Sequence, residues 1–311
     1  MFLLFLAAAF LYGDIEEHFK RASGKFGAHS MRNIDYIYLI NLDQRPEKYQ
    51  MSLAQLAPYG IEPYRFSAVN GWELSLEAIN DVGVRFSPEM EGGFMASCYR
   101  LDGEGKPSHE LVERYGETYF VHCMPRGGIG CALSHLSVLQ DAFDAGYQTI
   151  WVMEDDIEVL QNPHRLSDLI DQLDLLVGSD GWDILFTDRD FRNGQGLHVP
   201  AYGAAKRPDC AALHLAKDFS FKTDISPQFR QIANRYGTTS MIIRRSGMKK
   251  LLQFFKAHQI YLPYDMDLIY ANGIRIFTVS EDVVSNLPQA ISDLGGPYYT
   301  TIGQSLGYRT R

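Results

Sequence analysis

The sequence has 311 residues, of which 46% are hydrophobic and 13% aromatic, so it can bury a large core and is not a disordered chain. Its formal net charge of -9 repels nucleic-acid phosphates, so we expect no DNA or RNA partner. The four cysteines form no Cys-x-x-Cys pair, which argues against a zinc-binding module, and the chain is too long to need a disulfide framework.

The chain begins with an apolar run at residues 1–13 that is too short to span a bilayer. The run resembles the hydrophobic part of a signal peptide or a weak membrane anchor, but no basic residues precede it. Two locations stay open: export through this signal, or a cytoplasmic protein, at the inner face of the membrane if the run acts as an anchor. Residues 14–33 are polar and mixed, and we predict a linker there.

From residue 34 onward the predicted elements alternate between strand and helix. The apolar run at 34–42 is typical of a strand buried on both faces, and Pro46 suits the first turn of a helix that ends near residue 57. A second strand is predicted at 65–69. Residues 83–126 show no clear periodicity, and we interpret them as a long excursion that contains a binding loop.

The second half of the chain repeats this alternation. An apolar stripe predicts a helix at 131–145, and a β-branched run predicts a strand at 149–153. Six further segments follow in chain order: a helix at 164–177, a strand at 182–187, an irregular stretch at 189–236, a strand at 239–243, a helix at 246–255 and a strand at 274–279. The pattern predicts an α/β domain over 34–295, with a mostly parallel sheet flanked by helices and a C-terminal tail at 296–311.

In such sheets ligands bind at the carboxyl ends of the strands. The acidic triplet Glu154, Asp155 and Asp156 directly follows one predicted strand. Three adjacent carboxylates repel one another, and a hard divalent cation such as Mn²⁺ or Mg²⁺ would compensate their charge. A solvated acidic turn is the alternative interpretation of the same residues.

Glycines and polar residues precede or begin the helix predicted at 131–145. Glycines at 127, 128 and 130 allow a backbone to approach a ligand closely, and helix N-termini favour anions. Ser134 and His135 lie one turn further on, within reach of the same ligand. The alternative is a tight loop whose glycines, including Gly130, serve helix packing.

Two further sets of polar residues are candidates. Asn41, Asp43 and Arg45 follow the first strand, where Arg45 would contact a diphosphate and Asp43 a ribose or base; otherwise Asp43 caps the next helix. Asp265 and Asp267 lie two apart in a predicted extended stretch, so at most one faces the site as a general base, and otherwise both are surface acids. Asp188 ends the strand at 182–187 but matches no motif.

Taken together, these pieces resemble the glycosyltransferase family 25 domain, which includes bacterial lipooligosaccharide galactosyltransferases and animal collagen galactosyltransferases. The resemblance spans about residues 34–295. The stretches that carry it are 37–43 with Arg45, 66–71, 130–135 (Gly-Cys-Ala-Leu-Ser-His), 154–156, 236–238 with 241–243, and 263–265.

The resemblance implies a GT-A-like, Rossmann-like fold and a nucleoside-diphosphate sugar donor, a UDP-hexose with galactose as the first choice. It also implies inversion at the anomeric carbon, a glycan or lipid-linked saccharide acceptor, and a place in lipooligosaccharide biosynthesis. Asp155 and Asp156 would then bind the metal, while Asn41, Asp43, Arg45, Gly130, Ser134 and Glu154 would bind the donor. Asp265 is the first candidate for the catalytic base, before Asp267 and His135.

Two rival functions use the same features. A metal-dependent hydrolase would employ the acidic cluster to activate water. A non-catalytic module of the same fold would bind the nucleotide sugar without turnover.

Overall fold

The computed structural model describes residues 14–103, 105–201, 205–210 and 219–296. The predicted signal or anchor segment at 1–13 and all but the first residue of the predicted tail at 296–311 lie outside these ranges. Within the described residues, no helix has both the length and the apolar character to cross a membrane.

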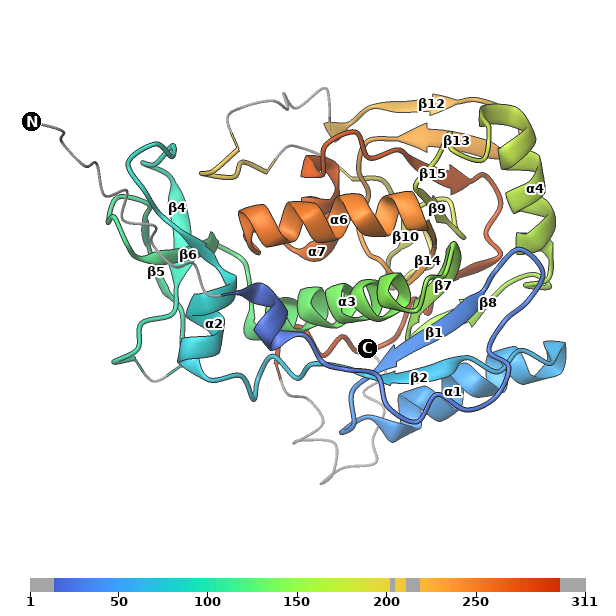
Figure 1. Cartoon of the computed structure of the whole chain (residues 1–311), viewed down its shortest axis with the longest axis horizontal. Coiled ribbons are helices and arrows are strands. Elements are labelled where there is room, and N and C mark those ends of the chain that lie inside the picture. The colour runs from blue at the N-terminus through green and yellow to red at the C-terminus, as the bar shows by residue number, and fades with distance from the viewer. Residues whose placement is uncertain (1–13, 104, 202–204, 211–218, 297–311) are drawn as a thin grey trace, which may run out of the picture.

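A central eight-stranded sheet organises the molecule (Figure 1). Its strands, in chain order, are β1 (Tyr36–Asn41), β2 (Tyr64–Ser67), β7 (Thr149–Glu154), β9 (Ile184–Phe186), β12 (Lys222–Asp224), β13 (Phe229–Ile232), β14 (Ser240–Arg244) and β15 (Ile276–Val279). Their order across the sheet is β12-β13-β15-β9-β14-β7-β1-β2. Only β14 and β13 run against the other strands, so the predicted α/β class with a mostly parallel sheet is confirmed.

Helices cover both faces of this sheet because its inner strands are apolar on both sides. In β1, Tyr36, Tyr38 and Ile40 face one hydrophobic cluster, while Ile37 and Leu39 face the other. The first cluster includes α3 (Arg126–Asp144) and α6 (Arg245–His258), and the second includes residues of α1 (Pro46–Leu56) and α4 (Arg165–Val177).

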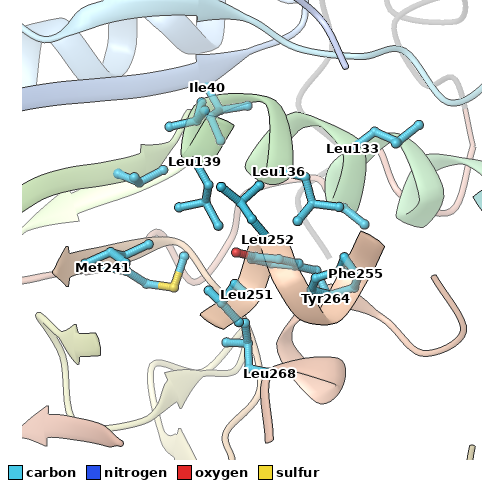
Figure 2. Close-up of a cluster of buried hydrophobic side chains, with 14 of the residues drawn as sticks. Ile40, Leu133, Leu136, Leu139, Met241, Leu251, Leu252, Phe255, Tyr264 and Leu268 are labelled. Carbon is cyan, nitrogen blue, oxygen red and sulfur yellow. The ribbon is translucent and has the colours of Figure 1, made fainter. Parts of the chain in front are cut away.

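The first cluster fixes the helix that carries the Ser-His pair. Leu133, Leu136 and Leu139 recur at helical spacing along α3 and meet side chains of α6 such as Leu251 and Phe255 (Figure 2). Their burial holds α3 beside the carboxyl ends of β1 and β7, where the polar residues of its first turns are needed.

The predicted excursion at 83–126 contains regular secondary structure that the sequence did not predict. It contains a second, four-stranded antiparallel sheet with the order β3-β6-β4-β5. Its strands are β3 (Val84–Arg85), β4 (Met95–Cys98), β5 (Ser108–Leu111) and β6 (Thr118–Val121), and α2 (Leu76–Val82) precedes them. Strands of two to four residues are too short to show a period of two along the sequence.

Short elements also occupy the described parts of 189–236, where no structure was predicted. These are β10 (Phe191–Arg192), β11 (His198–Val199), β12 and β13. Elsewhere β8 (Ile157–Val159) pairs with β16 (Val284–Asn286), and η1 (Ile15–His18), η2 (Ala57–Tyr59), α7 (Tyr264–Asp267) and η3 (Leu268–Tyr270) are single turns.

Residues 14–33 are not an unpacked linker. Ile15 is only 1% exposed and belongs to the same hydrophobic cluster as α3 and α6. The ammonium group of Lys25 bonds to the carboxylate of Asp141 on α3 and lies 4.7 Å from the ring centre of Tyr36. This stretch therefore covers part of the central sheet and helices, although its polar composition suggested a tether.

Candidate active site

The carboxyl ends of β1 and β7 lie next to each other in the sheet, and a cavity of about 110 Å³ is located there. Five segments line this cavity besides the acidic triplet: the end of β1, Lys48 of α1, the loop 68–72 after β2, the first turns of α3, and residues 292–294. A more open cavity of about 360 Å³ adjoins it, because Ala68, Val69 and Asn70 line both.

The acidic triplet follows β7, as predicted, and each carboxylate has its own environment. The Oε1 atom of Glu154 accepts hydrogen bonds from Thr238 Oγ1 at 2.7 Å and from His135 Nε2 at 3.0 Å. The Oδ2 atom of Asp155 accepts one from Asn41 Nδ2 at 2.6 Å. The Oδ1 atom of Asp156 is buried and has no hydrogen-bond partner among the described residues.

Burial separates the pKa values of these three acids. It raises the pKa of Asp155 to about 6, and burial together with the charge of Glu154 raises the pKa of Asp156 to about 7. Burial also acts to raise the pKa of Glu154, but the hydrogen bond and charge of His135 outweigh it and leave that pKa below its ordinary value. Proton affinity in this triplet therefore rises from Glu154 to Asp156.

The triplet has the oxygen chemistry of a site for a hard divalent cation, although its three side chains do not bring one ligand oxygen each within 4.8 Å of one another; in the described part of the chain Cys131, His135 and Glu154 do bring their ligand atoms that close. A buried carboxylate oxygen without a partner, such as Asp156 Oδ1, costs free energy that a bound cation would offset. The ammonium group of Lys48 lies 3.9 Å from Asp155 Oδ1 and supplies one positive charge against three carboxylates. Oxygen ligands are those that Mg²⁺ and Mn²⁺ prefer.

The two predicted residues of α3 beyond its glycines have structural partners. The hydroxyl of Ser134 donates to the carbonyl of Gly130 at 2.7 Å and accepts from the Val69 amide at 2.8 Å, which ties α3 to the loop after β2. The ring of His135 is 1% exposed and stacks on Tyr264 with 4.6 Å between ring centres. His135 thus orients Glu154 at the cavity.

Gly130 does not provide a ligand-binding loop. The helix α3 begins at Arg126, five residues before the predicted start, so Gly130 lies inside it. A β-carbon at Gly130 would lie 2.4 Å from the Gly71 amide nitrogen and 2.6 Å from the Val69 carbonyl oxygen. The glycine therefore serves close packing of two backbone segments, which was the alternative interpretation.

The three polar residues after β1 take different roles. Asn41 bridges Asp155 and the Arg45 carbonyl through its amide nitrogen and accepts from Arg65 Nε at 2.8 Å. Asp43 does not cap α1, whose N-cap position is Arg45; its carboxylate instead accepts from Ser67 Oγ at 2.6 Å and Arg65 Nη2 at 2.8 Å. Asp43 lines the larger cavity.

The guanidinium of Arg45 is buried and bonds to the carboxylates of Glu47 and Asp293. Asp293 also accepts from Lys48 Nζ at 2.8 Å. Neither Lys48 nor Asp293 was predicted. Lys48 offered one signal: it is a cation in the first turn of a helix, where the helix dipole disfavours positive charge. For Asp293 we find no signal in the sequence.

The candidate bases differ in their surroundings. Both oxygens of Asp265 accept backbone N–H bonds, from Gly237 at 2.7 Å and Met266 at 2.9 Å, and burial raises its pKa. Asp265 and Asp267 lie in the helical turn α7, not in an extended stretch. Asp267 is fully buried and paired with Arg207 at 2.6 Å, so it faces neither the cavity nor solvent.

Asp188 is likewise internal. Its carboxylate forms a two-pronged ion pair with Arg235, at 2.5 and 3.1 Å, and is almost fully buried. The structure thus brings Asn41, the triplet and His135 together, places Asp43 and Arg45 beside them, and leaves Asp188 and Asp267 within the fold.

This sheet, with an acidic triplet and a cavity at its carboxyl edge, is of the class that binds ligands at strand ends. A family model described as "Glycosyltransferase family 25 (LPS biosynthesis protein)" matches residues 34–268, more than half of the chain. The chain belongs to glycosyltransferase family 25.

Curated relatives match a shorter part of the chain. A "Glycosyltransferase 25 family member" of Aedes aegypti is 27% identical over 156 residues, covering 50% of this chain and 21% of the relative. Its namesake in Drosophila melanogaster is 29% identical over 144 residues, covering 46% and 19%. The human "Inactive glycosyltransferase 25 family member 3" is 26% identical over 156 residues, covering 50% and 22%. The match spans about a fifth of each relative's length.

Proposed function

We propose that the chain is an active glycosyltransferase that transfers a hexose, with galactose as the first choice, from a UDP-sugar to a hydroxyl of a glycan or lipid-linked saccharide, with inversion. The observation that carries the proposal is the unpartnered, buried Asp156 Oδ1 beside Asp155 in a cavity at the carboxyl edge of the sheet. The family's description as lipopolysaccharide biosynthesis proteins supports a saccharide acceptor.

Asp155 and Asp156 would hold Mn²⁺ or Mg²⁺. When bound, such a cation neutralises negative charge on the leaving diphosphate. Residues of the chain position the carboxylates. Asn41 holds Asp155 through a 2.6 Å hydrogen bond, while His135 and Thr238 keep Glu154 ionised and oriented. These contacts fix the first two carboxylates of the triplet before any ligand arrives, which favours selective binding.

The larger cavity suits the nucleoside end of the donor. It is polar and joins the smaller cavity through Ala68, Val69 and Asn70. Asp43 lines it with its carboxylate held by Arg65 and Ser67, in an orientation able to accept hydrogen bonds from ribose hydroxyls. Its neighbour Gln44 also lines this cavity, where its amide nitrogen donates to Glu73 Oε1 at 2.8 Å and its amide oxygen could accept from a base.

Asp265 remains our choice for the base. An inverting transfer needs a group that takes the proton of the acceptor hydroxyl as the new bond forms. Burial raises the pKa of Asp265, which makes its carboxylate a stronger proton acceptor, and two backbone N–H bonds hold it in place. Asp265 does not line either cavity, but it accepts from the Gly237 amide, and the next residue, Thr238, donates to Glu154.

A non-catalytic module that binds the nucleotide sugar is the second candidate. A metal-dependent hydrolase is the third. The three predict different products from one experiment, in which the chain is incubated with UDP-hexoses and Mn²⁺, with and without a saccharide acceptor.

Release of UDP that depends on the acceptor, with an inverted product by NMR, would support the proposal. Equal release without an acceptor would indicate a hydrolase. Calorimetric binding of UDP without any turnover would indicate the module. A chain that neither binds nor turns over any UDP-hexose would contradict all three.

A further inference from the structure

The cavity at the acidic triplet is small compared with the ligand of the proposed function. It measures about 110 Å³, whereas sites for small molecules commonly have about 300–1,000 Å³. The adjoining larger cavity has room for a nucleoside, but it is not lined by the triplet. A displacement of one lining segment would widen the space beside Asp155 and Asp156 for a diphosphate.

The segments that line the cavity differ in whether they are packed into the sheet and the buried hydrophobic clusters. Strands β1 and β7 and the helix α3 belong to the sheet and the main hydrophobic cluster. Another wall is part of the strap, which we define as residues 289–294 and of which residues 292–294 line the cavity. Among the described residues of the three buried hydrophobic clusters, none comes from the strap.

Polar contacts hold the strap in place. Lys48 Nζ donates to the Ile291 carbonyl and to Asp293 Oδ2, both at 2.8 Å, and Trp72 Nε1 donates to the Asp293 carbonyl at 3.1 Å. Arg45 Nη1 bonds to Asp293 Oδ1. The Asp293 side chain thus lies between two cations that are only 5% and 8% exposed.

The arrangement of these cations is that of an anion-binding seat. Arg45 and Lys48 each contact a different oxygen of one carboxylate, as they would contact two oxygens of a phosphate. Buried cations need a partner, and a diphosphate carries more charge than the carboxylate that now fills this role. Lys48 also lies 3.9 Å from Asp155, so the seat adjoins the triplet.

We propose that Arg45 and Lys48 form the diphosphate seat, that Asp293 occupies it as an internal competitor, and that diphosphate binding displaces Asp293 and moves the strap. The step exchanges one bound anion for another, and no covalent bond changes. The inference rests on the proposed function, because that function supplies the diphosphate.

The test compares the full-length wild type with Asp293→Asn, and with Asp171→Asn as the matched control. Asp171 is half exposed and paired with Arg32, so its variant changes the net charge equally. Affinities for UDP, pyrophosphate and uridine are measured by calorimetry in Mn²⁺. Because an internal competitor lowers apparent affinity by the fraction of closed seats, Asp293→Asn should bind UDP and pyrophosphate about tenfold more tightly.

Uridine lacks the diphosphate, so its affinity should not change in either variant, and Asp171→Asn should match the wild type throughout. Lys48→Gln should weaken pyrophosphate binding about tenfold or more. A second variant, Asp293→Ser, gives an independent measurement if Asp293→Asn does not fold. Equal tightening for uridine would overturn the seat, because the strap would then block the cavity without competing for the cations.

Displacement has its own readout in Trp72. Trp151 and Trp182 are fully buried, whereas the Trp72 indole bonds to the strap. UDP should therefore change tryptophan fluorescence in the wild type and not in Trp72→Phe. Tighter binding by Asp293→Asn without this signal would mean that Asp293 only repels the ligand, and would overturn displacement.

The inference and the proposed function fail differently. Wild type that binds UDP with Mn²⁺, together with unchanged or weaker binding by Asp293→Asn, would contradict the internal competitor and leave the proposed function standing. Wild type that binds neither UDP nor pyrophosphate would contradict both.

Discussion

The carboxyl group of Asp156 has a pKa raised to about 7 by burial and by the charge of Glu154. A group whose pKa is raised by folding stabilises the fold fully below its unfolded pKa, and this contribution is lost as the pH rises through the folded pKa. We therefore expect the chain in a chelator to lose free energy of unfolding between about pH 4 and pH 8.

Asp156→Asn should remove much of this loss. At pH 8 in a chelator, the variant should be more stable than the wild type by about 1 kcal/mol or more, because one pKa unit corresponds to roughly that amount. Mn²⁺ should raise the stability of the wild type and leave the variant unchanged. Urea unfolding from pH 5 to pH 8 measures both effects, with the exposed Asp102 changed to Asn as a control. A variant less stable than wild type at pH 8 would contradict the interpretation.

Asp265 and Asp267 lie two residues apart, but their substitution should affect different properties: activity at Asp265 and stability at Asp267. Asp265→Asn keeps the shape of the side chain and removes its capacity to accept a proton, so we expect kcat to fall by about 10²-fold or more at unchanged UDP affinity. Steady-state kinetics and calorimetry measure the two quantities separately. Loss of UDP affinity would instead assign Asp265 to the donor site, and retention of both would place the base elsewhere.

Asp267→Asn should act on stability. It leaves the fully buried guanidinium of Arg207 with one carboxylate partner fewer, and breaking a buried ion pair in this way costs about 3–5 kcal/mol. Thermal and urea unfolding test this directly. A variant with wild-type stability and a large loss of kcat would return Asp267 to the list of bases.

At the scale of elements, the start of α3 depends on one close approach. Replacing glycine by alanine inside a helix normally stabilises it by up to about 1 kcal/mol. At Gly130 the new methyl group would meet backbone atoms of Val69 and Gly71 at 2.4–2.6 Å, which cannot move without shifting the loop that lines both cavities.

Gly130→Ala should therefore destabilise the fold by about 2 kcal/mol or more and weaken UDP binding. Gly128→Ala is the matched control two residues away, because its nearest neighbour is the flexible Met124 side chain at 2.9 Å. We expect that variant to lie within about 0.5 kcal/mol of wild type in urea unfolding. Equal effects of both changes would show that the approach to Gly71 is not the cause.

At the scale of the whole molecule, the folded unit extends beyond the stretch 34–268 that carries the family match. Strand β15 and the strap follow it, and η1 precedes it with Ile15 buried. A chain that starts at Ser30 lacks Ile15 and also the pair between Lys25 and Asp141.

We expect this shortened chain to lose about 2–5 kcal/mol relative to one that starts at Asp14, the range for emptying a buried aliphatic site. Urea unfolding of the two chains measures the difference, and Ile15→Ala in the longer chain isolates the apolar part. Equal stability of the two chains would restore the interpretation of residues 14–33 as a linker.

The long elements with a clear period were predictable. The run of apolar residues in β1 before Asn41 reflects burial of the strand on both faces. The leucine stripe of α3 reflects burial of the helix on one face. Both patterns are visible in the sequence. The sheet at 84–121 was not predictable, because its strands of two to four residues are too short to show a period in the sequence. The reversed direction of β14 was also invisible, since a buried strand has the same composition in either direction.

By itself the sequence determined the α/β class and the place of Asn41 and the acidic triplet, because polar residues directly after an apolar strand must lie at the edge of the sheet. The sequence also predicted that Ser134 and His135 lie on a helix, and the apolar stripe of that helix fixes the helix's orientation against the core. Only the tertiary structure decided that Asp293, 245 residues after Lys48, lies between Lys48 and Arg45, and that Asp267 is locked to Arg207. Such pairings depend on where the folded backbone brings charges together, and charge on the chain alone does not encode distance.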